Sequence, residues 1–393
     1  MNIGLDAKRI FFNNSGLGNY GRRFYRALAK DPAGDHFFLY SPKPVPADNP
    51  YLYEIDPTNS NIVSSDKPLH KMFGGSLWRS GLINARLKTD QIGIYYGLSN
   101  EIPFGGKNSG MVKVVIIHDL IFLRYPQLYP AIDVFFYKQK TRYAAKNADY
   151  IIAVSEQTKR DIVDYYHVSE NKITVIYPGS DPIFYNRNTI EIKDIYGFER
   201  RYIISIGAIT PRKNLLKTVQ AFNVVKDKHD LDMVVIGQAV GLGREYLKTI
   251  LSFIKENNLS ERVHFLENVP YQYVPDLCRK AQLMVYPSRF EGFGMPIVEG
   301  LLSGIPVITS KGGCFPEAGG DAAVYVDPDD FKEIAGWIDK LMDSESLRNE
   351  LAARGIRYAE RFRQENIEKD IINFHRSVLH KLIGRGFEKV GDA

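Results

Sequence analysis

The feature that most constrains the fold of this 393-residue chain is the alternation of short apolar runs with longer segments of helical periodicity. Runs such as Val112–Ile117 and Met233–Ile236 carry apolar residues with little interruption. Such Val/Ile runs are typical of parallel strands that are buried on both faces. Strands that alternate with helices build parallel sheets covered by those helices. The sequence therefore predicts an α/β protein.

A turn-rich segment divides the predicted elements into two groups. Residues 7–9 are expected to form a charged loop after the first strand. Two prolines and a glycine interrupt the alternation at Tyr177–Pro182, as in a domain linker. We therefore predict two doubly wound domains, residues 1–180 and 181–365, with the active site in the cleft between them. The predicted strands are 2–6, 36–40, 93–96, 112–117, 150–154, 173–177, 202–206, 232–236, 262–266, 283–286, 306–309 and 324–326, and the main helices are 18–30, 131–147, 156–166, 213–228, 243–257, 272–280, 295–303, 330–342 and 345–360.

The composition is that of an ordinary globular protein, with 44% hydrophobic and 25% charged residues. No apolar run approaches the ~18 residues that suggest a membrane span. The first residues lack the basic-then-apolar order of a signal peptide. Cys278 and Cys314 match neither a disulfide framework nor metal-ligand spacing. We therefore expect a cytoplasmic protein with reduced thiols.

The net charge of +5 is mild, but the basic residues are clustered. A basic stretch interleaved with large apolar side chains can rest on an anionic membrane surface. A solvated face over ordinary core contacts is the alternative, so peripheral contact with the inner face of the plasma membrane stays open. The first cluster is Lys8, Arg9, Arg22, Arg23, Arg26 and Lys30, and the second is Lys67, His70, Lys71, Arg79, Arg86 and Lys88 with Phe73, Leu77, Trp78 and Leu82.

The most specific motif is the segment 288–300, which contains two carboxylates eight positions apart, Glu291 and Glu299. Glycines follow the first carboxylate, and glycine lets a backbone approach a ligand closely. An apolar helix is expected to carry the second, and a helix start presents N–H groups to an anion. At about 1.5 Å per helical residue, the carboxylates would lie roughly 12 Å apart. That separation exceeds the ~5–9.5 Å of glycosidase pairs and suits two contacts along a nucleotide-sugar.

Gly16–Gly21 has the literal pattern G-x-G-x-x-G. In a dinucleotide-binding fold this pattern follows the first strand directly, and an acidic residue follows the second strand. Here Ala7–Ser15 intervenes and the second strand ends at Ser41, so we exclude an NAD site. Gly16 and Gly18 are instead expected in a flexible loop that meets a phosphate or an acceptor. A surface turn that caps the next helix is the alternative.

Two polar pairs follow predicted strands, where open parallel sheets bind their ligands. His118 could hydrogen-bond a sugar hydroxyl or move a proton, and a structural histidine held by Asp119 is the alternative. Arg212 and Lys213 lie at a strand-to-helix turn. Cations are disfavoured at a helix start, so we predict that this pair stabilises a diphosphate leaving group.

Weaker signals lie in the turns at Gly237 and at Asn268–Val269, which could border a nucleotide base or be ordinary connections. Asp-x-Asp spacing at 230–232 and 327–329 would suit a metal-dependent transferase. One pair, however, leads into a strand and the other lies in a proline turn. We therefore predict no catalytic metal and no cofactor.

Together these segments resemble glycosyltransferase family 4 over almost the whole chain. The resemblance implies the GT-B fold, with two Rossmann-like domains that face each other across a cleft and a C-terminal helix, 366–393, that packs back on the first domain. Within the family, the chain is similar to bacterial mannosyltransferases of surface polysaccharide biosynthesis. The matching segments are 16–21, His118–Asp119, Ser155–Glu156, Tyr177–Gly179, Pro211–Asn214, the Glu291/Glu299 block, Ser310 and Pro316–Ala323.

The resemblance also assigns roles to residues. Glu291 would hold hydroxyls of the donor sugar, Glu299 would bind the ribose, and His118 would contact the transferred sugar. Many family members carry an arginine directly after the glycine of the second-domain turn, whereas here Ala208 stands there. The candidate donor-binding residues are Arg212, Lys213, Glu291, Gly292, Phe293, Gly294, Met295, Pro296, Ile297 and Glu299, and the candidate catalytic residues are His118, Lys213 and Glu291.

The function implied is metal-independent transfer of a hexose, with retention, from a nucleotide-diphosphate-sugar to a hydroxyl of a polysaccharide or lipid-linked oligosaccharide. GDP-mannose is the leading donor, and UDP-glucose and a UDP-N-acetylhexosamine are alternatives. Other classes are a nucleotide-sugar epimerase, a phosphorylase with pyridoxal phosphate, and a non-catalytic carbohydrate-binding protein. No nucleic-acid partner is expected.

Overall fold

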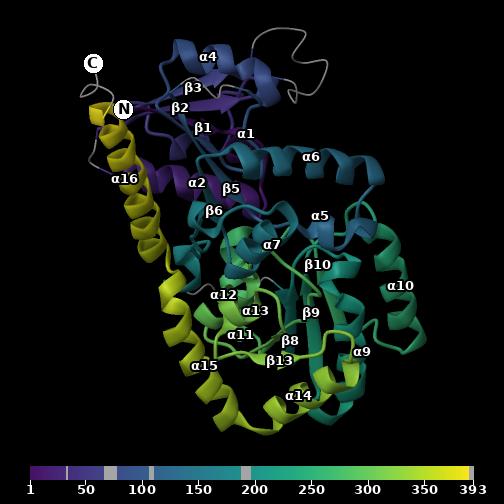
Figure 1. Ribbon diagram of the computed structural model, residues 1–393. Coiled ribbons are helices and arrows are strands. Elements are labelled where there is room, and N and C mark those ends of the chain that lie inside the picture. Colours follow the sequence, from purple (N-terminus) through teal and green to yellow (C-terminus); the bar gives the residue numbers. More distant parts are fainter. Residues whose placement is uncertain (32–33, 66–77, 106–109, 187–195, 389–393) are drawn as a thin grey trace. The chain divides into compact units, whose positions relative to one another are not determined.

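The computed structural model describes residues 1–31, 34–65, 78–105, 110–186 and 196–388, with side chains described as far as residue 383. The chain forms two compact units, Met1–Gly179 with Gln364–Ala393, and Ser180–Arg363. Each unit holds one parallel sheet together with its helices (Figure 1). The predicted α/β class with two doubly wound sheets is confirmed.

The sheet of the first unit has the strand order β3-β2-β1-β4-β5-β6-β7, and its neighbouring strands are parallel. Strand β5 is buried along its whole length, which explains its apolar sequence. The strands are β1 (Asn2–Asp6), β2 (His36–Ser41), β3 (Ser60–Ser64), β4 (Ile94–Gly97), β5 (Val112–Ile117), β6 (Tyr150–Ala153) and β7 (Ile173–Val175), and the helices are α1 (Lys8–Phe12), α2 (Gly16–Ala29), α4 (Ile83–Thr89), α5 (Ile121–Arg124), α6 (Ala131–Asn147), α7 (Glu156–Tyr166) and α16 (Gln364–Glu388).

The second unit has the strand order β10-β9-β8-β11-β12-β13, again with parallel neighbours. Counted from its first strand, this is the 3-2-1-4-5-6 order of a Rossmann fold. The strands are β8 (Arg201–Ile206), β9 (Leu231–Ile236), β10 (Val263–Leu266), β11 (Met284–Tyr286), β12 (Val307–Ser310) and β13 (Val324–Val326), and the helices are α9 (Leu215–His229), α10 (Gly243–Glu256), α11 (Val274–Lys280), α12 (Met295–Leu302), α13 (Phe315–Gly319), α14 (Phe331–Asp343) and α15 (Glu345–Ala359).

Helix α16 belongs to the first unit although it ends the chain. Arg376 donates to the carboxylate of Asp31 at 2.8 Å, and the His375 ring lies 2.9 Å from a carboxylate oxygen of Asp35. The other ring nitrogen of His375 lies 2.8 Å from the Tyr96 hydroxyl, in the core of the unit. These contacts attach the C-terminal helix to the beginning of the chain.

Two local predictions were wrong. Residues 8 and 9 lie in helix α1 and not in a loop, because Ile10 and Phe11 are buried and fix the segment as a helical turn. Edge strand β3 was missed because its central residues, Asn61 and Ile62, are both exposed and break the alternating pattern. In the second basic cluster, for which contact with a membrane stays open, Trp78 and Arg79 are buried.

The part of that cluster from Lys67 to Leu77 lies outside the described residues. Among the helices that are described, none is both long and apolar enough to cross a membrane.

Gly16–Gly21 is not the flexible loop that its glycines suggested. Helix α2 begins at Gly16, so the whole pattern is helical. A Cβ atom on Gly18 would lie 1.8 Å from the carbonyl oxygen of Asn13, whereas one on Gly16 would meet nothing within 4 Å. Gly18 is therefore required for the close approach of α2 to the preceding turn.

Candidate functional site

The second unit gathers its charged candidates at the carboxyl ends of β8 and β11, where the strand order reverses. The carboxylate of Glu291 accepts from two cations, Arg212 Nη1 at 2.5 Å and Lys213 Nζ at 2.8 Å. All three side chains are largely buried, with exposed fractions of 12 to 19%. In open α/β sheets, ligands bind at this reversal of strand order. The structure thus brings together three of the predicted site residues.

Two hydroxyl groups complete the bonding of Glu291. Its Oε1 atom also accepts from Tyr286 and from Ser288, each at 2.8 Å. The Arg289 backbone N–H donates to the Arg212 carbonyl at 2.9 Å, which ties the two loops together. Cys314 adds an Sγ contact of 3.3 Å to the Glu291 carbonyl oxygen. The cluster is therefore rigidly held by its own loops.

The electrostatics of the cluster favour an anionic ligand. Burial would raise the pKa of Glu291, but Lys213 and Arg212 outweigh it and lower this pKa to about 2. Burial lowers the pKa of Lys213, and Arg212 adds to this effect while Glu291 opposes it. Two cations facing one carboxylate leave one positive charge in excess. A diphosphate bound here would offset this excess charge and the repulsion between Arg212 and Lys213.

The predicted base-binding turns lie at the ends of neighbouring strands β9 and β10. A Cβ on Gly237 would lie 2.0 Å from the Gly207 carbonyl oxygen, so the two turns pack backbone against backbone. The Gln238 amide donates to the Asn268 side chain at 2.6 Å and joins the β9 turn to the β10 turn. Val269, next to Asn268, is half-buried. These turns border the cluster because Gly207 also packs near Lys213.

The segment after Glu291 and Gly292 leads into α12. Gly294 has φ of 119°, a conformation that favours glycine, and it forms the N-cap of the helix. Phe293 and Ile297 are buried. The backbone N–H of Ile297 donates to the Gly294 carbonyl oxygen and is therefore already hydrogen-bonded within the protein. Met295 and Pro296 form the first helical turn.

Glu299 lies one turn further along α12 and is half-buried. Burial raises the pKa of the Cys278 thiol, and the negative charge of Glu299 adds to this effect. Glu299 is thus close to Cys278, whereas Glu291 belongs to the cation cluster. The two carboxylates of the motif have separate surroundings.

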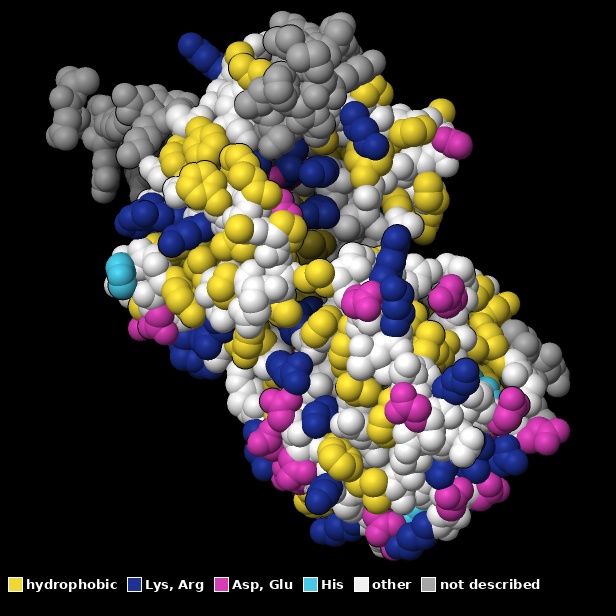
Figure 2. Space-filling model, turned by 90° about the vertical axis from the view of Figure 1, so that its right-hand side faces the viewer, with side chains coloured by type: hydrophobic (Ala, Val, Ile, Leu, Met, Phe, Trp, Pro, Cys, Tyr) yellow, Lys and Arg dark blue, Asp and Glu magenta, His cyan; other side chains and the backbone are white. Residues whose placement is uncertain are grey.

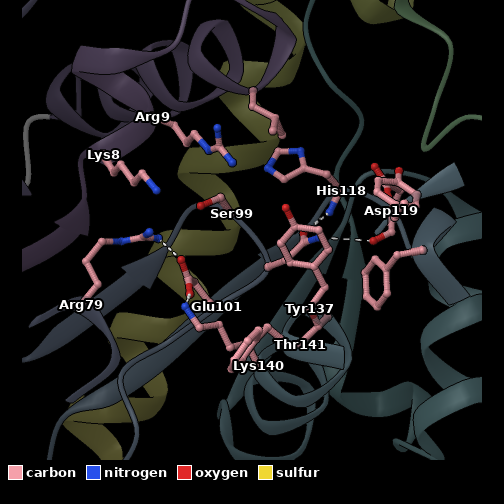
Figure 3. Close-up of a pocket in the computed structure, with 15 residues that line it drawn as sticks. Lys8, Arg9, Arg79, Ser99, Glu101, His118, Asp119, Tyr137, Lys140 and Thr141 are labelled. Atoms are coloured by element: carbon pink, nitrogen blue, oxygen red, sulfur yellow. Dashed lines mark hydrogen bonds and ion pairs between the residues drawn. The ribbon is translucent and has the colours of Figure 1, made fainter. Parts of the chain in front are cut away.

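The first unit contains a cavity of about 470 Å³ at the carboxyl ends of β1, β4 and β5 (Figure 3). This is the reversal point of its own sheet order. The lining combines basic, acidic, amide and aromatic side chains. It consists of Lys8, Arg9, Leu17, Arg79, Ser99, Asn100, Glu101, His118, Asp119, Phe122, Tyr129, Phe136, Tyr137, Lys140 and Thr141.

His118 lies in this cavity as a neutral side chain. Its Nε2 lies 2.8 Å from the Leu98 carbonyl oxygen, which can only accept, so this nitrogen carries the proton. Burial lowers the pKa of His118 to about 4. The Nδ1 atom is then a hydrogen-bond acceptor for a hydroxyl group. Asp119 accepts from the Ile121 N–H at 3.1 Å and so stabilises the beginning of the next helix.

The predicted glycine candidates are not part of the described lining of this cavity. Leu17 lines it, but Gly16 and Gly18 do not, and the Gly18 N–H donates to the Asn13 side chain at 3.0 Å. The flexible loop is therefore corrected, whereas the contact of these two glycines with a phosphate or an acceptor stays a prediction. They shape the start of α2.

Sequence reasoning missed Tyr286, which links Lys213 and Glu291, and it treated Lys8 and Arg9 only as part of a basic cluster. Position alone could have found them. Tyr286 ends strand β11, and Lys8 and Arg9 follow strand β1. Both positions lie at the ligand-binding edge of a parallel sheet.

The two Asp-x-Asp pairs are engaged with basic or backbone groups. Asp232 lies 2.9 Å from Arg262 and 2.9 Å from His264, and Asp329 lies 2.6 Å from Arg289. His229, Asp339 and Asp343 come close enough to hold a metal ion, but Lys228 also contacts both of these aspartates.

Solved structures with the same architecture identify the fold as GT-B. A sucrose-phosphate synthase from Thermosynechococcus elongatus matches with a TM-score of 0.79 and 19% identity, covering 97% of this chain and 100% of the other. HepE of Anabaena, solved in complex with UDP and glucose, matches with a TM-score of 0.74 and 18% identity, covering 96% and 100%.

The family is decided by sequence models. Residues 14–183 match the model described as Glycosyltransferase Family 4, and residues 188–358 match Glycosyl transferases group 1. The chain is a family 4 glycosyltransferase.

Curated relatives of this glycosyltransferase include enzymes of O-antigen synthesis. O-antigen chain mannosyltransferase B of Escherichia coli is 26% identical over 288 residues, which cover 72% of this chain and 74% of the relative. O-antigen chain mannosyltransferase RfbU of Salmonella typhimurium is 27% identical over 262 residues, which cover 67% and 69%. This glycosyltransferase is thus similar to bacterial mannosyltransferases.

Proposed function

We propose that this glycosyltransferase moves mannose from GDP-mannose to an acceptor hydroxyl of a polysaccharide or lipid-linked oligosaccharide, with retention and without a metal. The observation that carries the proposal is the cluster of Arg212, Lys213 and Glu291 at the reversal point of a Rossmann sheet. Its excess positive charge suits a diphosphate, and its carboxylate suits sugar hydroxyls.

Donor binding exchanges partners within this cluster. The diphosphate takes the bonds that Arg212 and Lys213 make to Glu291 in the structure. The freed Oε2 atom of Glu291 then accepts from hydroxyls of the sugar, while Tyr286 and Ser288 hold Oε1 in place. The site is thus organised before the donor arrives, which lowers the cost of binding.

In the transfer step, the bond between the anomeric carbon and the diphosphate oxygen breaks, and its electron pair stays on that oxygen. Lys213 and Arg212 stabilise the charge that develops there. The acceptor oxygen bonds to the anomeric carbon from the face that the diphosphate leaves, and its proton passes to a phosphate oxygen. The neutral His118 accepts a hydrogen bond at Nδ1 and takes no charge.

The choice of donor rests on similarity. The relatives named as mannosyltransferases support mannose, whereas HepE was solved with UDP-glucose at 17% identity to this chain. UDP-glucose and UDP-N-acetylhexosamines are therefore the alternative donors.

The test uses purified protein, GDP-mannose, UDP-glucose and UDP-N-acetylglucosamine. We expect one donor to raise the melting temperature and to be turned over with release of its nucleoside diphosphate. Lys213→Ala should lower kcat by about 10²–10³, the cost of removing one group that stabilises developing charge. Lys248→Ala, which removes an exposed lysine of the same unit, should leave kcat unchanged.

Full turnover by Lys213→Ala would refute the site. Loss of activity in EDTA would refute metal independence, and an inverted anomeric configuration in the product, read by NMR, would refute retention. An epimerised sugar that is not attached to an acceptor would favour the epimerase class.

A further inference from the structure

The cavity of the first unit holds more positive charge than the neighbouring acidic groups compensate. Four basic side chains line it, from α1, from residue 79 and from α6. Arg79 lies 2.6 Å from Asp6 and also contacts Glu101, and Lys140 lies 3.0 Å from Glu101. The carboxylates of Asp6 and Glu101 are therefore engaged by Arg79 and Lys140.

Lys8 and Arg9 have no such partner. Within the described part of the chain, neither side chain forms an ion pair, and the Arg9 Nε is buried with no hydrogen-bond partner. Figure 3 shows both side chains pointing into the cavity beside Ser99. Burial lowers the pKa of Lys8, and the charges of Arg79 and Arg9 lower it further, while Glu101 and Asp6 oppose this effect without outweighing it. Lys8 and Arg9 are half-buried, and partly desolvated cations without partners are costly unless a ligand supplies the counter-charge.

The other residues that line the cavity indicate what the ligand contains besides a phosphate. Phe136 and Tyr137 of α6 and the nearby Tyr129 supply aromatic side chains, on which the apolar face of a sugar ring can pack. The volume of about 470 Å³ exceeds that of a single phosphate and falls in the range of ligand pockets, which is about 300–1,000 Å³.

We propose that Lys8 and Arg9 bind a phosphate group of the acceptor, so that the acceptor substrate of this enzyme is a phosphorylated molecule. Arg9 can hold two phosphate oxygens in a bidentate manner, and Lys8 adds a point charge. The identity of this ligand as the acceptor rests on the proposed transfer reaction, but the binding site itself does not.

A second groove beside the cavity bears on whether the phosphate belongs to a sugar or to a lipid. It has a volume of about 620 Å³ and shares Phe136 and Lys140 with the cationic cavity. Its lining includes Leu82, Phe104 and Phe135, which are 54, 39 and 55% exposed. Hydrophobic side chains also gather beside Lys and Arg side chains in Figure 2. The phosphate could thus belong to a sugar phosphate or to a lipid phosphate, and the experiment separates the two.

The experiment measures binding to the full-length protein by titration calorimetry. The probes are glucose 6-phosphate and octyl phosphate, and their uncharged counterparts are glucose and octyl glucoside. We expect at least one phosphorylated probe to bind at least tenfold more tightly than its counterpart. Lys8→Gln and Arg9→Gln should each weaken this binding about tenfold or more, the cost of losing a charge-assisted hydrogen bond.

Three controls assign the binding to this cavity. Lys138→Gln removes an exposed charge of α6 that does not line the cavity, and its affinity should stay within about twofold of wild type since screened surface charges contribute little. Lys8→Arg keeps the charge and should retain binding. Lys213→Gln should also retain it, because that lysine lies in the other unit.

Tighter binding of octyl phosphate identifies a lipid phosphate, and tighter binding of glucose 6-phosphate identifies a sugar phosphate. The proposal is overturned if neither probe binds better than its counterpart, or if Lys8→Gln and Arg9→Gln bind like wild type. Loss in Lys213→Gln alone would also overturn it. Binding of the nucleotide-sugars is measured separately and should be unchanged in Lys8→Gln and Arg9→Gln. If the wild-type protein binds no nucleotide-sugar, that result refutes the proposed function and not the phosphate site.

Discussion

The sharpest test of the charge cluster is Glu291→Gln, which keeps the shape of the side chain and removes its charge. In wild type the carboxylate contacts Arg212 and Lys213 at 2.5 and 2.8 Å and offsets one of their two positive charges. The variant leaves two neighbouring buried cations without a counter-ion. We expect it to destabilise the ligand-free protein and to strengthen its binding of anions.

The magnitude follows from the pKa of Glu291. A pKa of about 2, against an ordinary value of 4.5, corresponds to about 3 kcal/mol of stability at neutral pH at ~1.4 kcal/mol per unit. Burial lowers the pKa of Lys213, so keeping this lysine charged costs free energy. The net contribution of the ion pair to stability is therefore at most the value derived from Glu291. Removing one partner of a buried pair nevertheless costs about 3–5 kcal/mol, because the other charge stays buried. We therefore expect a loss of about 3 kcal/mol.

The assay is thermal and urea denaturation of both proteins. For a domain of this size, about 3 kcal/mol lowers the melting temperature by roughly 6–12 °C. Because the pKa of Glu291 is lowered on folding, its contribution is present above pH 4.5 and is lost as the pH falls towards 2. The difference between the two proteins should therefore be largest at neutral pH and shrink in acid.

Inorganic pyrophosphate should raise the melting temperature of Glu291→Gln more than that of wild type, since the ligand replaces the lost counter-charge. The double variant Glu291→Gln/Lys213→Met should recover part of the lost stability. The reasoning fails if the single variant is as stable as wild type at pH 7, or if pyrophosphate stabilises both proteins equally.

Gly18→Ala should destabilise the protein by about 2 kcal/mol or more, a typical cost of overpacking, whereas Gly16→Ala should be neutral or stabilising because it adds a better helix former; equal effects in urea denaturation would restore the loop hypothesis. The pKa of His118 is about 4 in the folded protein, below its ordinary 6.5, so the unfolded chain takes up the proton at a higher pH and the free energy of unfolding should fall by up to about 3 kcal/mol from pH 6.5 to 4. His118→Asn should flatten this pH dependence, and an unchanged pH profile of stability would contradict the prediction. Gly237→Ala places a Cβ atom 2.0 Å from the Gly207 carbonyl oxygen and should abolish the rise in melting temperature caused by the nucleotide-sugar. Normal donor binding by this variant would show that the turns at Gly207 and Gly237 do not form part of the donor site.

Much of the fold follows from the sequence because its signals are local. An unbroken apolar run such as Val112–Ile117 can be satisfied only by a strand covered on both faces, and the structure buries all of it. The same holds for the order of elements, since strands separated by helices pair in parallel. Where burial is partial, as in β3, or where a few buried side chains stabilise a short helix, as in α1, the local signal was too weak.

The chemistry of single residues was only half determined by the sequence. Position after a strand located Arg212, Lys213 and His118, because parallel strands bring their carboxyl ends to one edge. Distances between side chains depend on loops, so only the tertiary structure could pair Glu291 with both cations and add Tyr286. It also decided that Gly18 serves helix packing, because the carbonyl that requires a glycine there belongs to a turn whose position no periodicity encodes.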